Sequence, residues 1–304
     1  MPDVSVIIVT RNTCALTCTA IESVLDAGAE IIVVDNASSD GTAETVGKRF
    51  PSVRLLRSES NLGFARAVNR AAHETQGRFL LLLNSDAALK PGSLAEAVSW
   101  MDAHPDCGVA GAQLLNPDGS RQNSIANFPT LATELLNKSL LRWLFPRRYP
   151  GKEQRFSEPV DVESVVGAFM LIRRETWEAI GGLDERYFFF LEETDFCRQA
   201  RARGWRVVHL SQVEVLHGQG QSVKVVSAEA RIEYWRSRYQ YFAKNHKSLL
   251  PLLRVGLCVR LVADWLFSGL LSIGSARWRN KWQVHSALLG WHLRGCPATM
   301  GLPR

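Results

Sequence analysis

The feature that most constrains the fold of this 304-residue chain is an alternation of short apolar runs with helical patterns in its first half. The apolar runs are rich in Val, Ile and Leu and apolar nearly throughout: Val4–Thr10, Glu30–Asn36, Val53–Ser58 and Arg78–Asn84. The segments between and after them have helical spacing: Ala15–Ala27, Thr42–Arg49, Ala65–Glu74 and Gly92–Ala103. Continuously apolar strands alternating with helices are typical of a parallel sheet covered on both faces. We therefore predict an α/β fold with a doubly wound, mostly parallel sheet.

The second half is less regular. Residues 120–160 are rich in Asn, Arg and Pro and are predicted to form a long functional loop or lid. The other strands are predicted at Gly108–Leu115, Val162–Arg173, Trp205–Leu210 and Val213–Leu216. Helices are predicted at Glu175–Ile180, Glu192–Arg203 and Ala228–Asn245.

Composition limits the class of protein. The chain is 46% hydrophobic and 22% charged, which is ordinary for a globular protein. A formal charge of +6 favours anionic partners such as a lipid surface or phosphorylated substrates, or reflects only a solvated basic face. We find no nucleic-acid-binding motif, so we expect no nucleic acid partner.

The cysteines and the N-terminus both favour the cytoplasm. The six cysteines are scattered, form no CxxC pair and are expected to be reduced thiols. The N-terminal sequence lacks the charged leader and cleavage site of a signal peptide, and its apolar part is expected to be a strand.

Polar residues follow three of the predicted strands at their carboxyl ends: Thr10-Arg11-Asn12, Asp35-Asn36 and Asn84-Ser85-Asp86. In open α/β sheets, ligands bind beyond the carboxyl ends of the strands. The polar residues therefore gather where the topology expects a ligand.

Two of the polar motifs suit a nucleotide. Asp35 could accept the N3–H of a uracil or thymine ring, although ordinary turn and cap chemistry also explains this motif. Asn61 and Gly63 form a turn into a helix that carries Arg66 and Asn69 on one face, which suits a diphosphate. The alternative is a capped amphipathic helix with a solvated arginine.

Asp86 and His217 are the candidate metal ligands. Asp86 follows a buried strand and could hold Mg²⁺ or Mn²⁺ bridging two phosphates, unless it only ends the strand in a turn. His217 enters a Gly-rich loop, and with Asp86 it would form a mixed O/N site that suits Mn²⁺. A single histidine is otherwise more often structural.

An acidic cluster follows an aromatic run. Glu192, Glu193 and Asp195 come directly after Tyr-Phe-Phe-Phe-Leu at the start of a predicted helix. Acidic residues there complement the helix dipole. Burial beside an apolar wall would also disfavour the charged carboxylate and make it a better general base.

The C-terminal region is apolar but interrupted by charge. Leu249–Ala276 contains Arg254, Arg260 and Asp264, and its longest charge-free part is too short to span a bilayer. Tryptophans and basic residues follow it. An interfacial helix on an anionic leaflet and a helical pair packed on the preceding α/β domain or a partner subunit are equally compatible with this pattern.

Six motifs together resemble family 2 glycosyltransferases with a GT-A fold, most nearly the bacterial rhamnosyltransferase-like members. In order they are VSVIIVTRN, VVDNASSDGT, NLGFARAVNRA, LLLNSDA, VGAFMLIRRETWEAIGGLDERYFFFLEETDFCRQARARGWRV and VLHGQGQS. The match spans about residues 4–246. It departs from the family pattern at Asn84, where the metal motif usually begins with Asp, and at the base, which is commonly Asp.

The resemblance implies a role for each motif. The nucleotide and donor sugar would be held by Thr10, Arg11, Asn12, Asp35, Asn36, Asn61, Gly63, Arg66, Asn69, Asn84 and Ser85. Asp86 and His217 would bind Mg²⁺ or Mn²⁺, and Glu193 would be the base, with Glu192 and Asp195 as neighbouring candidates. Gly167, Ala168 and Phe169 would line the acceptor side.

The resemblance also implies an activity. It is an inverting transfer of rhamnose or a related hexose from a dTDP- or UDP-sugar to a saccharide or lipid-linked acceptor, in cell-surface polysaccharide synthesis. We expect a catalytic domain over residues 1–226, with a nucleotide half at 1–118 and an acceptor half at 119–226. The helical segment 227–304 would place the enzyme peripherally on the cytoplasmic face of the inner membrane.

Two other functions fit the fold. A non-catalytic membrane-associated scaffold is disfavoured because Asp86, Glu193 and His217 are all present. A sugar nucleotidyltransferase would usually have a Gly-rich loop after the first strand, where this chain has Thr10-Arg11-Asn12-Thr13.

Overall fold

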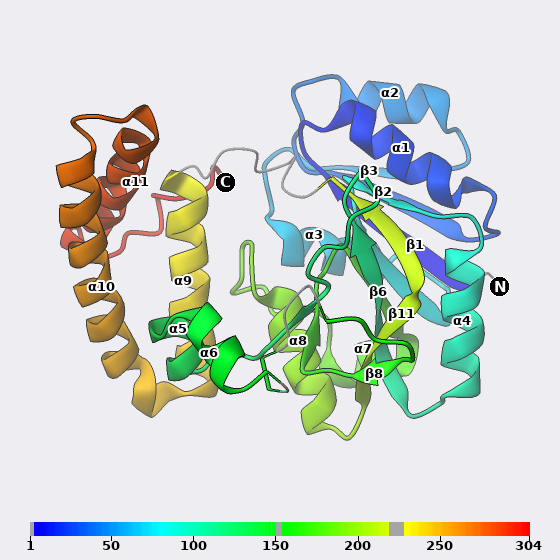
Figure 1. Cartoon of the computed structure of the whole chain (residues 1–304). Coiled ribbons are helices and arrows are strands. Elements are labelled where there is room, and N and C mark those ends of the chain that lie inside the picture. Colours follow the sequence, from blue (N-terminus) through cyan, green and yellow to red (C-terminus); the bar gives the residue numbers. More distant parts are fainter. Residues whose placement is uncertain (1–2, 147, 150–153, 219–227) are drawn as a thin grey trace. The chain divides into compact units, whose positions relative to one another are not determined.

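A computed structural model describes residues 3–146, 148–149, 154–218 and 228–304 (Figure 1). The chain divides into two compact units. The first comprises Met1–Phe128, Pro150–Glu185 and Glu192–Ser222, and the second Pro129–Tyr149, Arg186–Leu191 and Val223–Arg304. The second unit thus takes in two segments from the middle of the chain. The domain boundary expected near residue 226 lies outside the described residues.

The first unit is built on a nine-stranded sheet with the order β3-β2-β1-β4-β10-β6-β11-β5, and β8 pairs with β11. Its strands are β1 (Val4–Thr10), β2 (Glu30–Asp35), β3 (Arg54–Arg57), β4 (Phe79–Asn84), β5 (Ala87–Leu89), β6 (Cys107–Leu115), β8 (Val160–Asp161), β10 (Phe169–Arg173) and β11 (Arg206–His217). Strands β1 to β4 are parallel to one another, and β6 is parallel to β11. Strand β10 runs antiparallel between β4 and β6.

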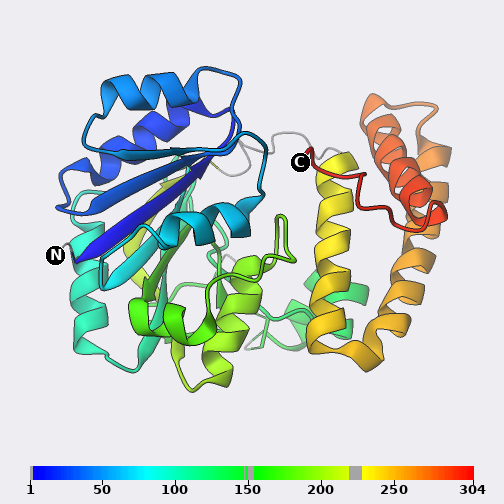
Figure 2. The same ribbon diagram turned by 180° about the vertical axis from the view of Figure 1, so that it is seen from behind.

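Helices cover both faces of this sheet, as predicted (Figures 1 and 2). One face packs against α1 (Cys14–Leu25), α2 (Thr42–Arg49) and α4 (Ser93–Ala103). The other packs against α3 (Phe64–Ala72), α7 (Arg174–Ile180) and α8 (Glu192–Ala202). Successive residues of each strand point to opposite faces, so a strand buried on both sides must be apolar throughout. The predicted α/β fold is confirmed.

Three details differ from the predictions. Residues 120–160 are not irregular throughout, because they contain β7 (Ile125–Ala126), α5 (Leu131–Leu135) and α6 (Lys138–Leu144). The strand predicted at Val162–Arg173 is divided into β9 (Ser164–Val165), which pairs with β7, and β10. The two strands predicted between residues 205 and 216 form the single strand β11, with a register shift between Leu210 and Glu214.

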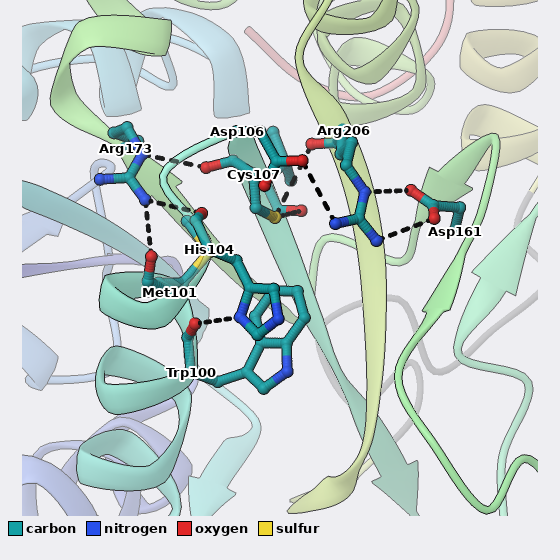
Figure 3. Close-up of polar contacts among 9 residues, drawn as sticks. Trp100, Met101, His104, Asp106, Cys107, Asp161, Arg173 and Arg206 are labelled. Carbon is teal, nitrogen blue, oxygen red and sulfur yellow. Dashed lines mark hydrogen bonds and ion pairs between the residues drawn. The ribbon is translucent and has the colours of Figure 1, made fainter.

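Two arginines tie the elements together at the beginning of β6 (Figure 3). Arg173 donates hydrogen bonds to the carbonyls of Cys107 (3.0 Å), Met101 (2.7 Å) and His104 (3.2 Å), so it caps the end of α4. Arg206 donates to both carboxylate oxygens of Asp161, at 2.9 Å each.

The second unit is helical. It contains α5, α6, α9 (Ala228–Asn245), the 3₁₀ turn Lys247–Leu249, α10 (Leu250–Leu271) and α11 (Ala276–Leu293). Its core is a cluster of aromatic and aliphatic side chains that includes Tyr187, Trp235, Tyr241 and Trp291. Arg238 and Glu134 form a buried ion pair at 2.5 Å between α9 and α5.

Candidate active site

Strand pairing brings the predicted polar motifs to one edge of the sheet. Thr10 pairs with Asp35 between β1 and β2, and Val9 pairs with Asn84 between β1 and β4. The backbone N–H of Asn84 donates to the carbonyl of Ala168, 3.1 Å away. The predicted nucleotide, metal and acceptor motifs therefore adjoin one another along this edge.

Buried hydroxyl groups hold the carboxyl ends of β1 and β4 in place. Thr10 Oγ1 lies 2.6 Å from Thr17 Oγ1 and 2.9 Å from Thr13 Oγ1. Thr13 in turn donates to Ser85 Oγ at 3.1 Å. Thr10 and Ser85 thus belong to an internal network that fixes the edge.

Asn12 joins the loops that follow β1 and β2. It adopts a left-handed conformation (φ 55°), which asparagine tolerates better than most residues. Its side-chain oxygen accepts from the backbone N–H of Ser39 (2.7 Å), and its own N–H donates to Ser38 Oγ (3.0 Å). Arg11, beside it, is partly exposed.

Asp35 has an unsatisfied acceptor. The residue is only 4% exposed, and one carboxylate oxygen accepts from the N–H of Ser38 at 3.3 Å. The other oxygen, Oδ1, is buried and has no hydrogen-bond partner among the described residues. Because a buried acceptor without a donor is costly, an N–H from a bound ligand would stabilise this carboxylate.

The side chain of Asn36 positions the backbone of the turn that precedes α3. The amide of Asn36 donates to Asn61 Oδ1 (2.8 Å) and to the carbonyl of Gly63 (3.2 Å), and its oxygen accepts from the N–H of Leu62 (2.8 Å). These bonds shape the turn into α3, where Gly63 has a positive φ of 79°.

On α3, Asn69 exchanges hydrogen bonds with the backbone of Leu183, at 2.8 and 2.9 Å, and donates to Glu185. Arg66 Nε lies 3.4 Å from Glu185 Oε2, and both side chains are more than half exposed. Asn69 is thus engaged with the protein, whereas the guanidinium of Arg66 is accessible to a solvent-borne anion.

Asp86 and His217 lie together because β5 pairs with β11. The pairing sets Ala87 opposite His217, and the N–H of Gly218 donates to the carbonyl of Asp86 at 2.7 Å. His217 Nε2 is 3.4 Å from Asp86 Oδ1, and both side chains are largely buried. The rest of the Gly-rich loop, from residue 219, lies outside the described residues.

This pair fits one kind of metal site. Within the described ranges, no group of three or more His, Cys, Asp or Glu side chains could hold a metal by itself. Mg²⁺ and Mn²⁺ need few protein ligands when substrate phosphates and water complete their coordination. A carboxylate and an imidazole nitrogen therefore suit a cation shared with a diphosphate.

The side chain of Gln122 contacts His217 and fixes the hydrogen-bonding role of its Nδ1. The sequence motifs gave no signal for Gln122. Its amide NH₂ donates to the carbonyl of His217 (2.7 Å) and to Asn116 Oδ1 (2.8 Å). Because a backbone carbonyl can only accept, the amide oxygen must face His217 Nδ1, 2.9 Å away. Nδ1 therefore donates, and Nε2, the nitrogen that faces Asp86, is the one that could bind a metal.

Within the acidic cluster, the three carboxylates differ in exposure. Glu192 and Asp195 are buried, and Asp195 accepts a hydrogen bond from Gln199 at 3.0 Å. Glu193 is partly exposed. A Cβ placed on Gly167 would be 3.5 Å from Glu193 Cβ and Cγ, so the glycine and this glutamate lie in contact. Of the three, Glu193 is the one best placed to meet a substrate.

The three residues predicted for the acceptor side differ in exposure. Ala168 and Phe169 are fully buried in the core beneath the sheet edge, where neither side chain could contact an acceptor. Only Gly167 is partly exposed. Ala168 and Phe169 are buried because they lie just before and at the beginning of β10, which pairs with a strand on each side.

Comparison with known proteins identifies the family of this chain. Residues 5–181 match the family model Glycosyl transferase family 2. The chain is 29% identical over 231 residues to N-acetylglucosaminyl-diphospho-decaprenol L-rhamnosyltransferase of Mycobacterium tuberculosis, covering 71% of this chain and 75% of that protein. It is 27% identical over 254 residues to the O-antigen biosynthesis protein RfbC of Myxococcus xanthus, covering 79% of this chain and 19% of that protein.

Among solved structures, a mannosyltransferase from Pyrobaculum calidifontis in complex with GDP-Man and Mn²⁺ has the same fold. The TM-score is 0.57 at 19% sequence identity, over 96% of this chain and 86% of the other. The family match spans more than half of the chain and contains the ends of β1, β2 and β4 together with Asp86, whereas Glu193 and His217 lie beyond it. This chain belongs to glycosyl transferase family 2 and is a glycosyltransferase of GT-A fold.

Proposed function

We propose that the enzyme transfers rhamnose or a related hexose from a dTDP- or UDP-sugar to a hydroxyl of a saccharide or lipid-linked acceptor, with inversion. The observation that carries this proposal is the meeting of three acidic positions, Asp35, Asp86 and Glu193, at one sheet edge. The name of the mycobacterial relative, a rhamnosyltransferase acting on a decaprenol-linked sugar, supports the donor and the acceptor.

Donor binding is assigned to residues 1–118. The unsatisfied Oδ1 of Asp35 would accept the N3–H of uracil or thymine, which both bases present alike. Arg66 would approach the diphosphate. The turn formed by Asn36, Asn61 and Gly63 would shape the pocket around the diphosphate. Asp86 and His217 would hold a divalent cation, which when bound neutralises charge on the departing diphosphate.

Acceptor binding is assigned to residues 119–226. Glu193 would take the proton from the acceptor hydroxyl as that oxygen attacks the anomeric carbon and the bond to the diphosphate breaks. A single displacement of this kind inverts the anomeric configuration. Gly167 leaves space beside Glu193, because any side chain there would contact the glutamate.

We further propose that the enzyme works on the cytoplasmic face of the inner membrane. All six cysteines are free thiols, which suits a reducing compartment. A lipid-linked acceptor would be reached at a membrane surface. No helix among the described residues is long and apolar enough to span a bilayer.

A donor screen that measures release of nucleoside diphosphate would test this function. With dTDP-rhamnose, UDP-hexoses and polyprenyl-diphosphate-linked acceptors, we expect one donor to support turnover, and NMR of the product should show an inverted anomeric centre. Glu193→Gln should retain nucleotide-sugar binding but lose about two to four orders of magnitude in turnover. The matched control is Glu178→Gln, an exposed glutamate on α7.

Two results would contradict parts of the proposal. Near-normal turnover by Glu193→Gln would remove Glu193 from the role of base. Activity that persists in EDTA would exclude the metal assignment while leaving the base and the donor assignments open to their own tests.

A further inference from the structure

Helix α10 is apolar on two opposite sides. Leu253, Leu257 and Leu261 are buried in the core of the second unit. A second set of aliphatic side chains is exposed: Leu252, Val255, Val259, Val262, Leu266 and Leu270. Their spacing of three and four residues makes them one stripe, called the outer row here. At 3.6 residues per turn, the outer row lies about 180° from the buried leucines.

The sequence pattern places Arg260, Asp264 and Ser268 on one helical face, as the polar face of an interfacial helix would require. The structure turns this face toward the helical core: Ser268 is fully buried and lies 3.0 Å from His285 Nδ1 on α11. Arg260 and Asp264 pair with each other at its margin, 3.7 Å apart. The side of α10 that meets solvent is therefore the aliphatic one.

The outer row is too extensive for an ordinary solvated surface. Helix α10 has 22 residues and is about 33 Å long, and no charged residue lies within the row. Val259, Leu266 and Leu270 are 66%, 60% and 72% exposed. Continuous exposed apolar patches of this kind mark surfaces that are covered by a membrane or a partner.

A basic and aromatic cluster continues the outer row beyond its C-terminal end. Ile273 is 86% exposed in the turn between α10 and α11. Trp278 packs edge-on against Phe267 at 5.5 Å, and the ammonium of Lys281 lies 4.2 Å above the Trp278 ring. Arg277 and Arg279, in the same first turn of α11, are exposed as well.

The charge of the C-terminal residues indicates what covers the outer row. From residue 265 to the last residue the sequence contains five Arg and Lys residues and no Asp or Glu. A second copy pairing along α10 could offer these cations only Asp264, which already pairs with Arg260. Anionic head groups neutralise them directly, while the outer row and Trp278 enter the boundary between head groups and acyl chains.

We propose that α10 lies flat on an anionic lipid leaflet, with the outer row facing the acyl chains and Arg277, Arg279 and Lys281 at the head groups. This docking would hold the enzyme at the surface where a lipid-linked acceptor resides, and only that consequence rests on the proposed function. The docking itself depends on lipid composition and not on sugar transfer.

Sedimentation of the full-length protein with vesicles tests the docking. We expect binding to vesicles of phosphatidylcholine with phosphatidylglycerol, weaker binding to phosphatidylcholine alone, and weakening by salt. Val259→Asp with Leu266→Asp should abolish binding to both. Replacing Arg277, Arg279 and Lys281 by Ala should lower affinity for anionic vesicles on the order of a hundredfold, with little effect on neutral ones. The matched control is Leu25→Asp, an exposed leucine on α1.

The proposal is overturned if wild type ignores anionic vesicles or if the outer-row variant sediments like wild type. Conversion of a wild-type dimer to a monomer by the same variant without lipid would instead identify the row as a contact between copies. Circular dichroism checks that each variant folds. Sugar transfer to a water-soluble acceptor is measured in parallel. Vesicle binding without sugar transfer would refute the proposed function alone. Sugar transfer without vesicle binding would refute the docking alone.

Discussion

At the scale of single residues, neutral amides set up the site more than charged groups do. Asn36 shapes the turn at Asn61–Gly63, Asn69 holds the backbone at Leu183, and Gln122 orients His217. An amide has a donor and an acceptor at fixed positions, so it can dictate how its neighbours are oriented. These residues act through others and are positioning residues.

Gln122→Leu should weaken metal binding. Without the amide oxygen, no acceptor holds the proton on Nδ1 of His217. The ring can then shift to the tautomer in which Nε2 carries the proton and cannot bind a metal. We expect Mn²⁺ affinity in the presence of dTDP or UDP to fall by about 10- to 100-fold, measured by electron paramagnetic resonance titration. In metal-free protein, ¹⁵N NMR should show the Nδ1-protonated tautomer of His217 only when Gln122 is present. The control is Gln76→Leu at an exposed position, and unchanged Mn²⁺ affinity in Gln122→Leu would contradict the prediction.

His209 should make the fold sensitive to acid. Burial, with a smaller contribution from Arg121, lowers the pKa of His209 from 6.5 to about 4. Between these values the unfolded chain binds a proton that the folded chain does not, so stability is lost as the pH falls from above 6.5 toward 4. This group alone should cost about 2 kcal/mol between pH 7 and pH 5.

Urea unfolding at the two pH values tests the role of His209. His209→Phe keeps a ring against Phe156 and removes the titration, so its free energy of unfolding should decrease less on acidification than that of wild type. His73→Gln, at an exposed position, serves as control. Equal acid sensitivity of wild type and His209→Phe would exclude His209 as the cause.

At the scale of elements, β10 connects the two halves of the first unit. It joins the parallel strands β1 to β4 to the β6–β11 pair by running antiparallel to both neighbours. Its first residue, Phe169, pairs with Leu83 of β4, and its last residue, Arg173, caps α4 at the other end. One end of β10 therefore positions β4, and the other end positions α4.

Arg173→Met should destabilise the first unit. The substitution keeps most of the side-chain volume but leaves the carbonyls of Met101, His104 and Cys107 without their charged donor (Figure 3). We expect a loss of about 2 kcal/mol in the free energy of unfolding, measured by chemical denaturation. Arg57→Met, which breaks an exposed ion pair with Glu44, should change it by less than about 1 kcal/mol. Equal effects of the two substitutions would refute the capping role.

At the scale of the whole molecule, the second unit is assembled from three separate segments. Tyr187, Leu191 and the partly buried Leu131 and Leu135 belong to the same apolar cluster as the C-terminal helices. A chain ending at residue 226 would keep these side chains and lose the helices that bury them. We expect such a fragment to bind the dye ANS and to aggregate, whereas the full chain with Leu293→Ser, at a side chain 88% exposed, should behave as wild type. A soluble, dye-silent fragment would contradict this.

The local sequence pattern was enough to predict which strand ends gather at one edge of the sheet. Strands buried on both faces must be apolar throughout, so the predicted bounds of β1, β2 and β4 agree with the observed ones within one residue. Parallel strands bring their carboxyl ends together, and this rule alone groups Thr10, Asp35 and Asn84 at one edge. The family resemblance added the order of the motifs and the reaction class.

Tertiary structure alone decided the rest. The resemblance had already paired Asp86 with His217, but only the structure shows that β5 and β11 bring them together. Gln122 reaches His217 from a segment with no recognisable motif. Likewise, α10 is apolar on two sides, and a periodic pattern cannot say which side the other helices cover. Contacts between residues distant in sequence leave no local periodicity, because they depend on which elements become neighbours when the chain packs.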